Sequence, residues 1–387
     1  MNPPTGAAAP RARVPLRVIV REWGRIGIVG VGGPPAHIAL LRGVVVEREQ
    51  WMNGEEFEHA VAAANLLPGP ASTQLMIYSA WRLRGALGAL VGGVCFITPG
   101  LVTIIALAAV FLARHPAHVV LGGALGAGAA VPAVAARTAW QLARPSWHQS
   151  RESGGARRWA IYCTLGAAAA LFLPALVVLA LLACGVAEIM VLRPSTPRAM
   201  GAALGSAHVL TLGGLGALAW VAFKVGALSY GGGFVIIPLM QHDVVNTYHW
   251  LSGAQFLNVV ALGQVTPGPV VLTVAAVGYA AHGLEGATLA TLVAFAPSFG
   301  FVVLGAPYFE RLRLNATFSA FLAGAGASVI GAIGASAISL TLLLTHLWQV
   351  PVLVTALVWV FALRRSTPLM LVGAALVGAA LSGVVPV

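Results

Sequence analysis

A segment near the start of the chain occurs a second time, with changes, 199 residues later. Because this spacing stays constant over the whole segment, the chain contains two copies of one unit. Both copies lie in apolar sequence interrupted by helix breakers, a pattern typical of membrane transporters whose related halves enclose one binding site. The recurring positions are Gly32-Gly33 and Gly231-Gly232, Trp51 and Trp250, Phe57 and Phe256, and Pro68-Gly69-Pro70 and Pro267-Gly268-Pro269.

The composition places the chain in a lipid bilayer. Of its 387 residues 59% are hydrophobic and only 9% are charged, and the mean hydropathy is +0.89. A soluble domain carries about 25% charged residues. Apolar stretches of roughly 20 residues, the length needed for a membrane helix, follow one another from residue 22 onward. We therefore expect an all-α integral protein of the cell (inner or plasma) membrane, with the lipid bilayer as its surroundings.

The breakers and polar connections divide this sequence into about thirteen transmembrane helices. The expected organisation is a cytoplasmic N-terminal tail over 1–21, a first transmembrane repeat over 22–192, an orientation-reversing helix within 193–217, and a second repeat over 218–387.

Arginines at the ends of the apolar segments indicate the topology. They give the chain a net charge of +11 but follow no polar face, so a nucleic-acid partner is not expected. Cytoplasmic loops are enriched in Lys and Arg. This rule places the N-terminus and the polar connection 141–158 in the cytoplasm if 54–81 and 252–281 each cross once, broken in the middle. The first copy then begins inside and the second outside, which predicts inverted repeats with broken helices and alternating access.

Each copy contains two breaks. The first is Gly32-Gly33-Pro34-Pro35, matched by Gly231-Gly232-Gly233, and the second is the Pro-Gly-Pro tripeptide. An interrupted backbone is tolerated in hydrocarbon only where it is buried in protein or lines a cavity. A kink for packing is the simpler alternative. The half-helices that begin after Pro70 (with Ser72 in the first turn) and after Pro269 present free N–H groups and partial positive charge, which suit an anion.

Matched polar residues flank the second break. Asn65 and Gln264 are amides that could donate hydrogen bonds to a ligand or join neighbouring helices. Asn53 and Ser252 have Glu56 and Gln255 three residues later, which is the capping-box pattern. The caps predict where each broken helix begins.

Two cations occupy equivalent positions, Arg25 and Lys224, the latter being the only lysine. They predict an anion-binding pair, one cation from each repeat; anchoring at the membrane edge is the alternative. His37 could hydrogen-bond an oxyanion, carry a proton or have a structural role. Asp243 is interpreted as a polar helix end rather than a proton carrier.

Enzyme, metal and cofactor signatures are missing from the sequence. Cys95, Cys163 and Cys184 form no CxxC pair and are expected to be packing residues. The cluster from Glu55 to His59 contains one Glu-x-x-His without the second motif of a di-metal site, so we interpret it as a solvated helix start. No phosphate-binding loop is present, and no cofactor, metal or catalytic residue is expected.

Four motifs resemble those of the chromate ion transporter family in its long, two-domain form: 223–233, from Phe223 to Gly233; 263–271, from Gly263 to Val271; Gly32-Gly33-Pro34 with His37; and 66–72, from Leu66 to Ser72. The stretch Val29-Gly30-Val31 departs from the family, which usually has an aromatic residue there. The resemblance implies secondary active export of chromate, and hence chromate resistance, with proton antiport or anion exchange as the coupling.

The expected substrate is chromate, with sulfate or a related oxyanion as the alternative, bound between the breaks of both repeats. A membrane-embedded reductase would need a redox centre for which no motif is present, and a passive channel would need no coupling ion. The oligomeric state stays open, a homodimer being one arrangement.

Overall fold

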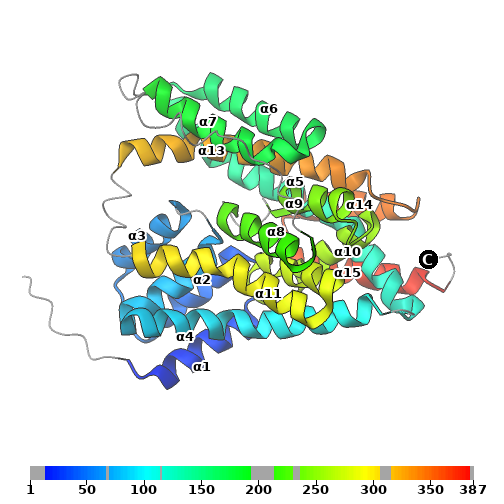
Figure 1. The fold of residues 1–387 in the computed structure, drawn as a ribbon, viewed down its shortest axis with the longest axis horizontal. Coiled ribbons are helices and arrows are strands. Elements are labelled where there is room, and N and C mark those ends of the chain that lie inside the picture. The colour runs from blue at the N-terminus through cyan, green and yellow to red at the C-terminus, as the bar shows by residue number, and fades with distance from the viewer. Residues whose placement is uncertain are drawn as a thin grey trace, which may run out of the picture.

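The computed structural model describes residues 14–66, 69–113, 116–192, 213–229, 236–305 and 315–383, without the side chains of residues 65, 66 and 236. Every regular element in these ranges is helical, which confirms the predicted all-α class (Figure 1). Within them, five helices are long and apolar enough to cross a membrane, and three further apolar helices are shorter. The protein is therefore an all-α multi-pass membrane protein; the predicted number of thirteen crossings is not confirmed.

The first half of the chain forms these described elements: α1 (Leu16–Val29), α2 (Pro34–Arg42), the π-helical turn η1 (Gly43–Arg48), α3 (Gly54–Leu66), α4 (Ala71–Phe111), α5 (His118–Glu152), α6 (Ala156–Phe172), η2 (Pro174–Leu176) and α7 (Val177–Leu192). The second half forms α8 (Gly214–Leu228), α9 (Ile236–Gln241), the π-helical turn η3 (His242–Thr247), α10 (Gly253–Val265), η4 (Val270–Leu272), α11 (Thr273–Gly305), α13 (Ala316–Thr341), α14 (Gln349–Phe361) and α15 (Thr367–Leu381).

The backbone repeats at the spacing found in the sequence. A π-helical turn occurs at the same place in each half, η1 and η3, and π-helices are rare. Two residues after each turn the backbone adopts a positive φ, 51° at Gln50 and 52° at His249. Uncommon conformations at equivalent positions support the prediction that the chain contains two copies of one unit.

The predicted caps are confirmed. The side chain of Asn53 accepts a hydrogen bond from the amide of Glu56 at 2.7 Å, and this fixes the start of α3. Ser252 and Gln255 form the full reciprocal capping box at the start of α10, with distances of 2.9 and 3.2 Å.

Both α4 and α11 fold back on themselves at matched kinks. The kink residues are Arg84 (φ −146°, ψ 18°) and Gly85 (φ 63°, ψ −152°), equivalent to His282 (φ −145°, ψ 29°) and Gly283 (φ 60°, ψ −148°). The two limbs of α4 then lie side by side. A Cβ atom added to Gly93 would lie 2.9 Å from Cγ1 of Ile77, whereas a straight helix would separate these residues by about 24 Å.

The segments around the breaks return to the side from which they enter. Glu22 of α1 pairs with Arg48 of η1, and Glu56 of α3 pairs with Arg82 of α4. Each pair is 26 residues apart, about 39 Å along a straight helix. Segments 16–48 and 54–83 are therefore re-entrant hairpins, and the prediction that 54–81 crosses the membrane once is wrong.

The second half contains the same reversals. Lys224 of α8 forms an ion pair with Asp243 of η3 across the first break. Across the second break, a Cβ atom added to Gly263 would lie 2.0 Å from Oγ1 of Thr273. The prediction failed because charge bias in loops does not distinguish one broken crossing from a reversal. The contact between the two ends of the segment does, because Glu56 and Arg82 form an ion pair.

The predicted polar connection 141–158 is also corrected. Residues 141–152 continue α5 as a helix, and only a short turn precedes α6. This extension is held against α6 by tryptophans. The Trp159 indole donates to Oγ of Ser146 at 2.8 Å, and its ring lies edge-on to Trp147 with centroids 5.2 Å apart. These contacts allow a polar segment to remain helical.

The two halves are interleaved rather than separate. Helix α13 of the second half packs on α6 and α7, whereas α14 and α15 pack on α5 of the first half (Figure 1). Helix α4 in turn packs on α11. Glycines permit the closest approaches: a Cβ atom on Gly166 would lie 1.9 Å from the Ser328 carbonyl oxygen, and one on Gly331 would lie 1.8 Å from that of Cys163. The described helices of both repeats therefore share one core.

Candidate functional site

The four re-entrant hairpins reverse at the breaks, and the residues there that the structure describes are called the hairpin tips: 30–33, 69–70, Ser229 and 266–269. Residues 67–68 and 230–235 lie outside the described part of the chain. Tips from different repeats touch: the amide of Gly268 donates a hydrogen bond to the carbonyl oxygen of Gly30 at 3.0 Å. A contact therefore joins the first break of one repeat to the Pro-Gly-Pro break of the other.

Glycine is required at the Pro-Gly-Pro tips because of the reversal. Gly69 has φ 125° and Gly268 has φ 92°, a region that side-chain-bearing residues rarely adopt. Pro70 and Pro269 then begin the next helices as N-caps. The Pro267 carbonyl oxygen faces Gly100, where a Cβ atom would lie 2.3 Å away. Small residues and fixed turns therefore let the tips approach the long limbs of α4 and α11.

His37 joins three parts of this centre. It is fully buried, and its Nε2 lies 2.9 Å from the carbonyl oxygen of Gly30, the acceptor that Gly268 also uses. Its Nδ1 lies 3.3 Å from Oγ of Ser72 in the first turn of α4. The imidazole also stands edge-on to Phe96 at 5.0 Å. Through its two ring nitrogens His37 joins the two tips of the first repeat to each other, and the hydrogen bond from Gly268 to Gly30 links them to the second repeat.

Three helix N-termini begin at the described tips without a capping side chain. They are α2 after Gly33, α4 after Pro70 and η4 after Pro269. Pro34 and Pro35 remove the first two N–H groups of α2. The first turns of α4 and η4 keep theirs, so backbone donors and partial positive charge come mainly from the helices that follow Pro-Gly-Pro.

Buried polar atoms accompany these N-termini. Four of them have no hydrogen-bond partner among the described residues: Thr73 Oγ1, Ser229 Oγ, Gln264 Nε2 and Ser298 Oγ. Thr73 follows one tip by three residues, Gln264 precedes another by two, and Ser229 begins a third. Ser298 faces the same tip as Thr73, its Oγ lying 3.1 Å from where a Cβ atom of Gly69 would be. Buried donors are normally paired, so these four groups leave hydrogen-bonding capacity unused near the tips.

Sequence reasoning found only one of these four residues. Gln264 was predicted from its match with Asn65. Thr73 could have been found because it neighbours Ser72, and Ser229 because it immediately precedes a break. Nothing local pointed to Ser298, which reaches the Gly69 tip only through the packing of α11 against α4.

The predicted pair of cations does not meet at the tips. Arg25 lies on the exposed face of α1, with no hydrogen bond or ion pair to a described residue. Lys224 forms an ion pair with Asp243, and their side chains are 19% and 15% exposed, respectively. The Lys224 ammonium also lies 5.8 Å from the Trp220 ring centroid. Asp243, interpreted from sequence as a polar helix end, is therefore the partner of Lys224.

Comparison with known proteins also divides the chain into two halves. The sequence profile of the chromate transporter family matches residues 18–189 and 216–379, one match for each half.

The chain belongs to the chromate transporter family.

Relatives in this family extend over nearly the whole chain. A chromate transport protein of Cupriavidus metallidurans is 33% identical over 378 residues, covering 94% of this chain and 92% of the relative. A chromate transport protein of Pseudomonas aeruginosa is 31% identical over 342 residues, covering 82% and 79%. A probable chromate transport protein of Synechococcus elongatus is 27% identical over 380 residues, covering 94% and 95%. No solved structure matches the chain.

Membership of the chromate transporter family confirms the resemblance seen in the motifs, and it places the chain among transporters. Some motif residues cannot be placed: Pro68, Gly231, Gly232 and the side chain of Asn65 lie outside the described residues. Glu58, in the cluster that resembled a metal motif, pairs with Arg42 at an exposed position. Within the described ranges no three His, Cys, Asp or Glu side chains form a group that could hold a metal ion.

Proposed function

We propose that the protein is a secondary active transporter that carries chromate across the cell membrane. Membership of the chromate transporter family supports the substrate, because relatives that cover nearly the whole chain are named chromate transport proteins. Chromate is a tetrahedral dianion whose oxygens accept hydrogen bonds from several directions. A site for it needs convergent donors rather than a catalytic group.

The observation that carries this proposal is the set of buried donors without partners at the hairpin tips. Thr73, Ser229, Gln264 and Ser298 come from both repeats, as do the uncapped N-termini of α4 and η4. An unpaired buried donor costs about 1–3 kcal/mol. An oxyanion that accepted from these groups would remove that cost, and the two N-termini would favour its charge.

In this proposal the cations Arg25 and Lys224 attract the dianion and neutral donors bind it. Lys224 can contribute a full charge only when it separates from Asp243. Arg25 is already exposed and unpaired among the described residues. This order suits transport, since a dianion held by two buried cations would be released slowly.

Alternating access would change the contacts between the tips. The hydrogen bond from Gly268 to Gly30 joins the repeats in the described state, and Nε2 of His37 contacts the same carbonyl oxygen. We propose that these tips separate as the two repeats exchange conformations, so that the site opens first to one side and then to the other. Proton antiport with His37 as the carrier, or anion exchange, would drive the cycle.

The proposed direction is export, which would give chromate resistance, with the N-terminus in the cytoplasm. Re-entrant folding supports this orientation. Both hairpins of the first repeat return to the side from which they enter, so the predicted crossings 22–42 and 54–81 are both removed from the topology. Arg21, Arg84 and the arginine-bearing end of α5 then still share one side. The inverted arrangement of the repeats requires a crossing within 193–217, of which 193–212 lies outside the described residues.

Chromate uptake by everted membrane vesicles tests the proposal. Vesicles containing the natural chain should accumulate chromate, and collapse of an imposed proton gradient should abolish accumulation if protons are the coupling ion. Empty vesicles are the control. Accumulation of sulfate without chromate would replace the substrate by the alternative oxyanion, and equilibration without any gradient at channel-like rates would contradict active transport.

A further inference from the structure

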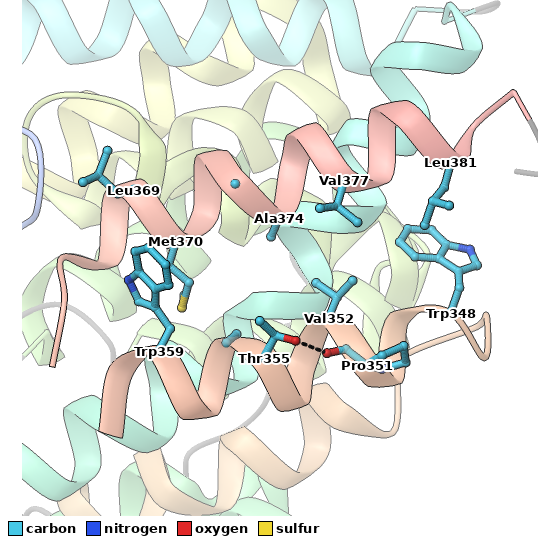
Figure 2. A pocket seen from close by; sticks show the side chains of 12 residues that line it. Trp348, Pro351, Val352, Thr355, Trp359, Leu369, Met370, Ala374, Val377 and Leu381 are labelled. Carbon is cyan, nitrogen blue, oxygen red and sulfur yellow. Dashed lines mark hydrogen bonds between the residues drawn. The ribbon is translucent and has the colours of Figure 1, made fainter. Parts of the chain in front are cut away.

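An apolar groove separates α14 from α15 on the outside of the helix bundle. Both helices pack closely on α5, but they contact each other much less. The space between them has a volume of about 440 Å³ and is lined mainly by apolar side chains. Figure 2 shows Trp348 and Leu381 at one end and Trp359 with Leu369 at the other. Leu369 and Val377 on its rim are 66% and 47% exposed, so the groove opens to the surroundings of the protein.

The length of the groove matches half of a bilayer. Trp348 and Trp359 are 11 residues apart, about 16 Å along a helix, and the hydrocarbon core is about 30 Å thick. The indole of Trp359 donates to the carbonyl oxygen of Ser366 at 3.1 Å, which fixes this ring beside the turn between the two helices. Tryptophans of this kind are typical of the boundary between hydrocarbon and headgroups.

Positive charge collects at the Trp359 end. Arg364 and Arg365 are exposed in the turn that joins α14 to α15. Arg137 of α5 donates to the carbonyl oxygen of Arg365 at 2.8 Å and so brings a third guanidinium to the same place. Among the described residues no carboxylate lies within ion-pair distance of these three. One turn further along α5, Trp140 is 56% exposed, which extends the aromatic boundary at this level.

We propose that this groove binds an anionic phospholipid. One acyl chain lies between α14 and α15 and runs from Trp359 toward Trp348. The headgroup phosphate lies at the other side of Trp359, against Arg364, Arg365 and Arg137. The unpaired arginines favour an anionic lipid over a zwitterionic one, because each cation near a membrane surface attracts negative lipid. The apolar lining and leaflet-matched length favour an acyl chain over a polar ligand.

A second apolar groove supplies a matched control. It lies between α8 and the second limb of α11, has a volume of about 570 Å³, and is lined by residues such as Phe223, Ala296 and Leu304. Its described lining contains neither tryptophan nor arginine. Each groove contains a glycine where an added Cβ atom would meet nothing within 4 Å, Gly373 in the first and Gly300 in the second. Leucine at either position therefore fills the groove without distorting the helix.

The experiment measures binding of phosphatidylglycerol and phosphatidylcholine to the purified full-length protein in detergent, by native mass spectrometry. We expect the natural chain and Gly300→Leu to bind phosphatidylglycerol preferentially. Gly373→Leu should lose most of this binding. Arg364→Gln combined with Arg365→Gln should weaken it by roughly tenfold or more, whereas Arg151→Gln combined with Arg157→Gln, exposed arginines elsewhere, should not.

Three outcomes would overturn the proposal: equal binding of the two lipids, unchanged binding in Gly373→Leu, or a protein dimer that Gly373→Leu dissociates. The last result would assign the groove to a second copy of the chain. Thermal unfolding of each variant in lipid-free detergent separates loss of binding from loss of folding.

Discussion

The amide of Gly268 donates to the carbonyl oxygen of Gly30 over 3.0 Å, and this hydrogen bond joins a hairpin tip of one repeat to a tip of the other. The two residues stand 238 positions apart in the sequence and come from different breaks of the repeated unit. His37 uses the same acceptor. A single carbonyl oxygen thus couples both halves, and changes around it should affect transport more than folding.

Replacing His37 should impair transport. His37→Ala removes two hydrogen bonds in a buried place and should lower the unfolding free energy by about 2–3 kcal/mol and abolish chromate uptake. His37→Gln can keep one or both contacts and should recover part of both properties. Thermal unfolding and vesicle uptake, measured across pH, check this. A proton-carrying role would make uptake by His37→Gln independent of pH, whereas a purely structural role would leave the pH profile unchanged.

Removing the unpartnered donors should affect substrate binding without destabilising the protein. Ser229→Ala and Gln264→Leu each remove a buried polar atom that has no partner in the described residues, and leucine keeps most of the volume of the glutamine side chain. We expect an unchanged or higher unfolding temperature and a KM for chromate raised about fivefold for each, corresponding to about 1 kcal/mol for one hydrogen bond. Ser150→Ala, at the end of α5, is the control. A fall in stability with an unchanged KM would show that these groups serve packing alone.

Variants of the ion pair between Lys224 and Asp243 distinguish two roles for Lys224: attraction of the substrate and structural pairing with Asp243. Each single alanine variant leaves a mostly buried charge unpaired and should cost about 2 kcal/mol, while the double variant should cost less. If Lys224 attracts chromate, uptake should be lost in Lys224→Ala and in the double variant but retained in Asp243→Ala. Equal uptake in the two single variants, with recovery in the double, would assign the pair to structure.

The re-entrant hairpin over 54–83 predicts that its two ends are reached from the same side of the membrane. Cysteines placed at Glu56 and at Arg82, which pair in the structure, should both react with a membrane-impermeant thiol reagent in everted vesicles and neither should react in intact cells. The same protein with Cys95, Cys163 and Cys184 replaced by alanine is the background. Labelling of the two positions from opposite sides would restore the single broken crossing and would contradict the hairpin.

Much of the fold could be predicted because it depends on local properties of the chain. Apolar length gave the all-α class, and the caps at Asn53 and Ser252 marked the starts of α3 and α10. The course of the chain between these helix starts could not be predicted from local sequence. Loop charges indicate only on which side of the membrane each connection lies. They therefore did not distinguish a broken crossing from a hairpin, which the ion pair between Glu56 and Arg82 reveals.

The candidate site also has features that the sequence predicts and features that depend on tertiary packing. Pro-Gly-Pro and Gly-Gly were recognisable as breaks because proline and glycine act on their own backbone. The position of Ser298 beside Gly69 depends on how α11 packs on α4. The pairing of Lys224 with Asp243 depends on the reversal between them. Neither relation has a signal within a single helix.

The sequence by itself determined that this is a membrane transporter of two repeated units with paired breaks, because hydropathy, helix breakers and repetition are properties of short stretches of chain. Only the tertiary structure decided that the breaks are tips of re-entrant hairpins, that the halves interleave through α5 and α13, and that neutral donors rather than Arg25 and Lys224 stand at the tips. These features follow from contacts between residues far apart in sequence, where close packing in lipid selects one arrangement among many with the same local pattern.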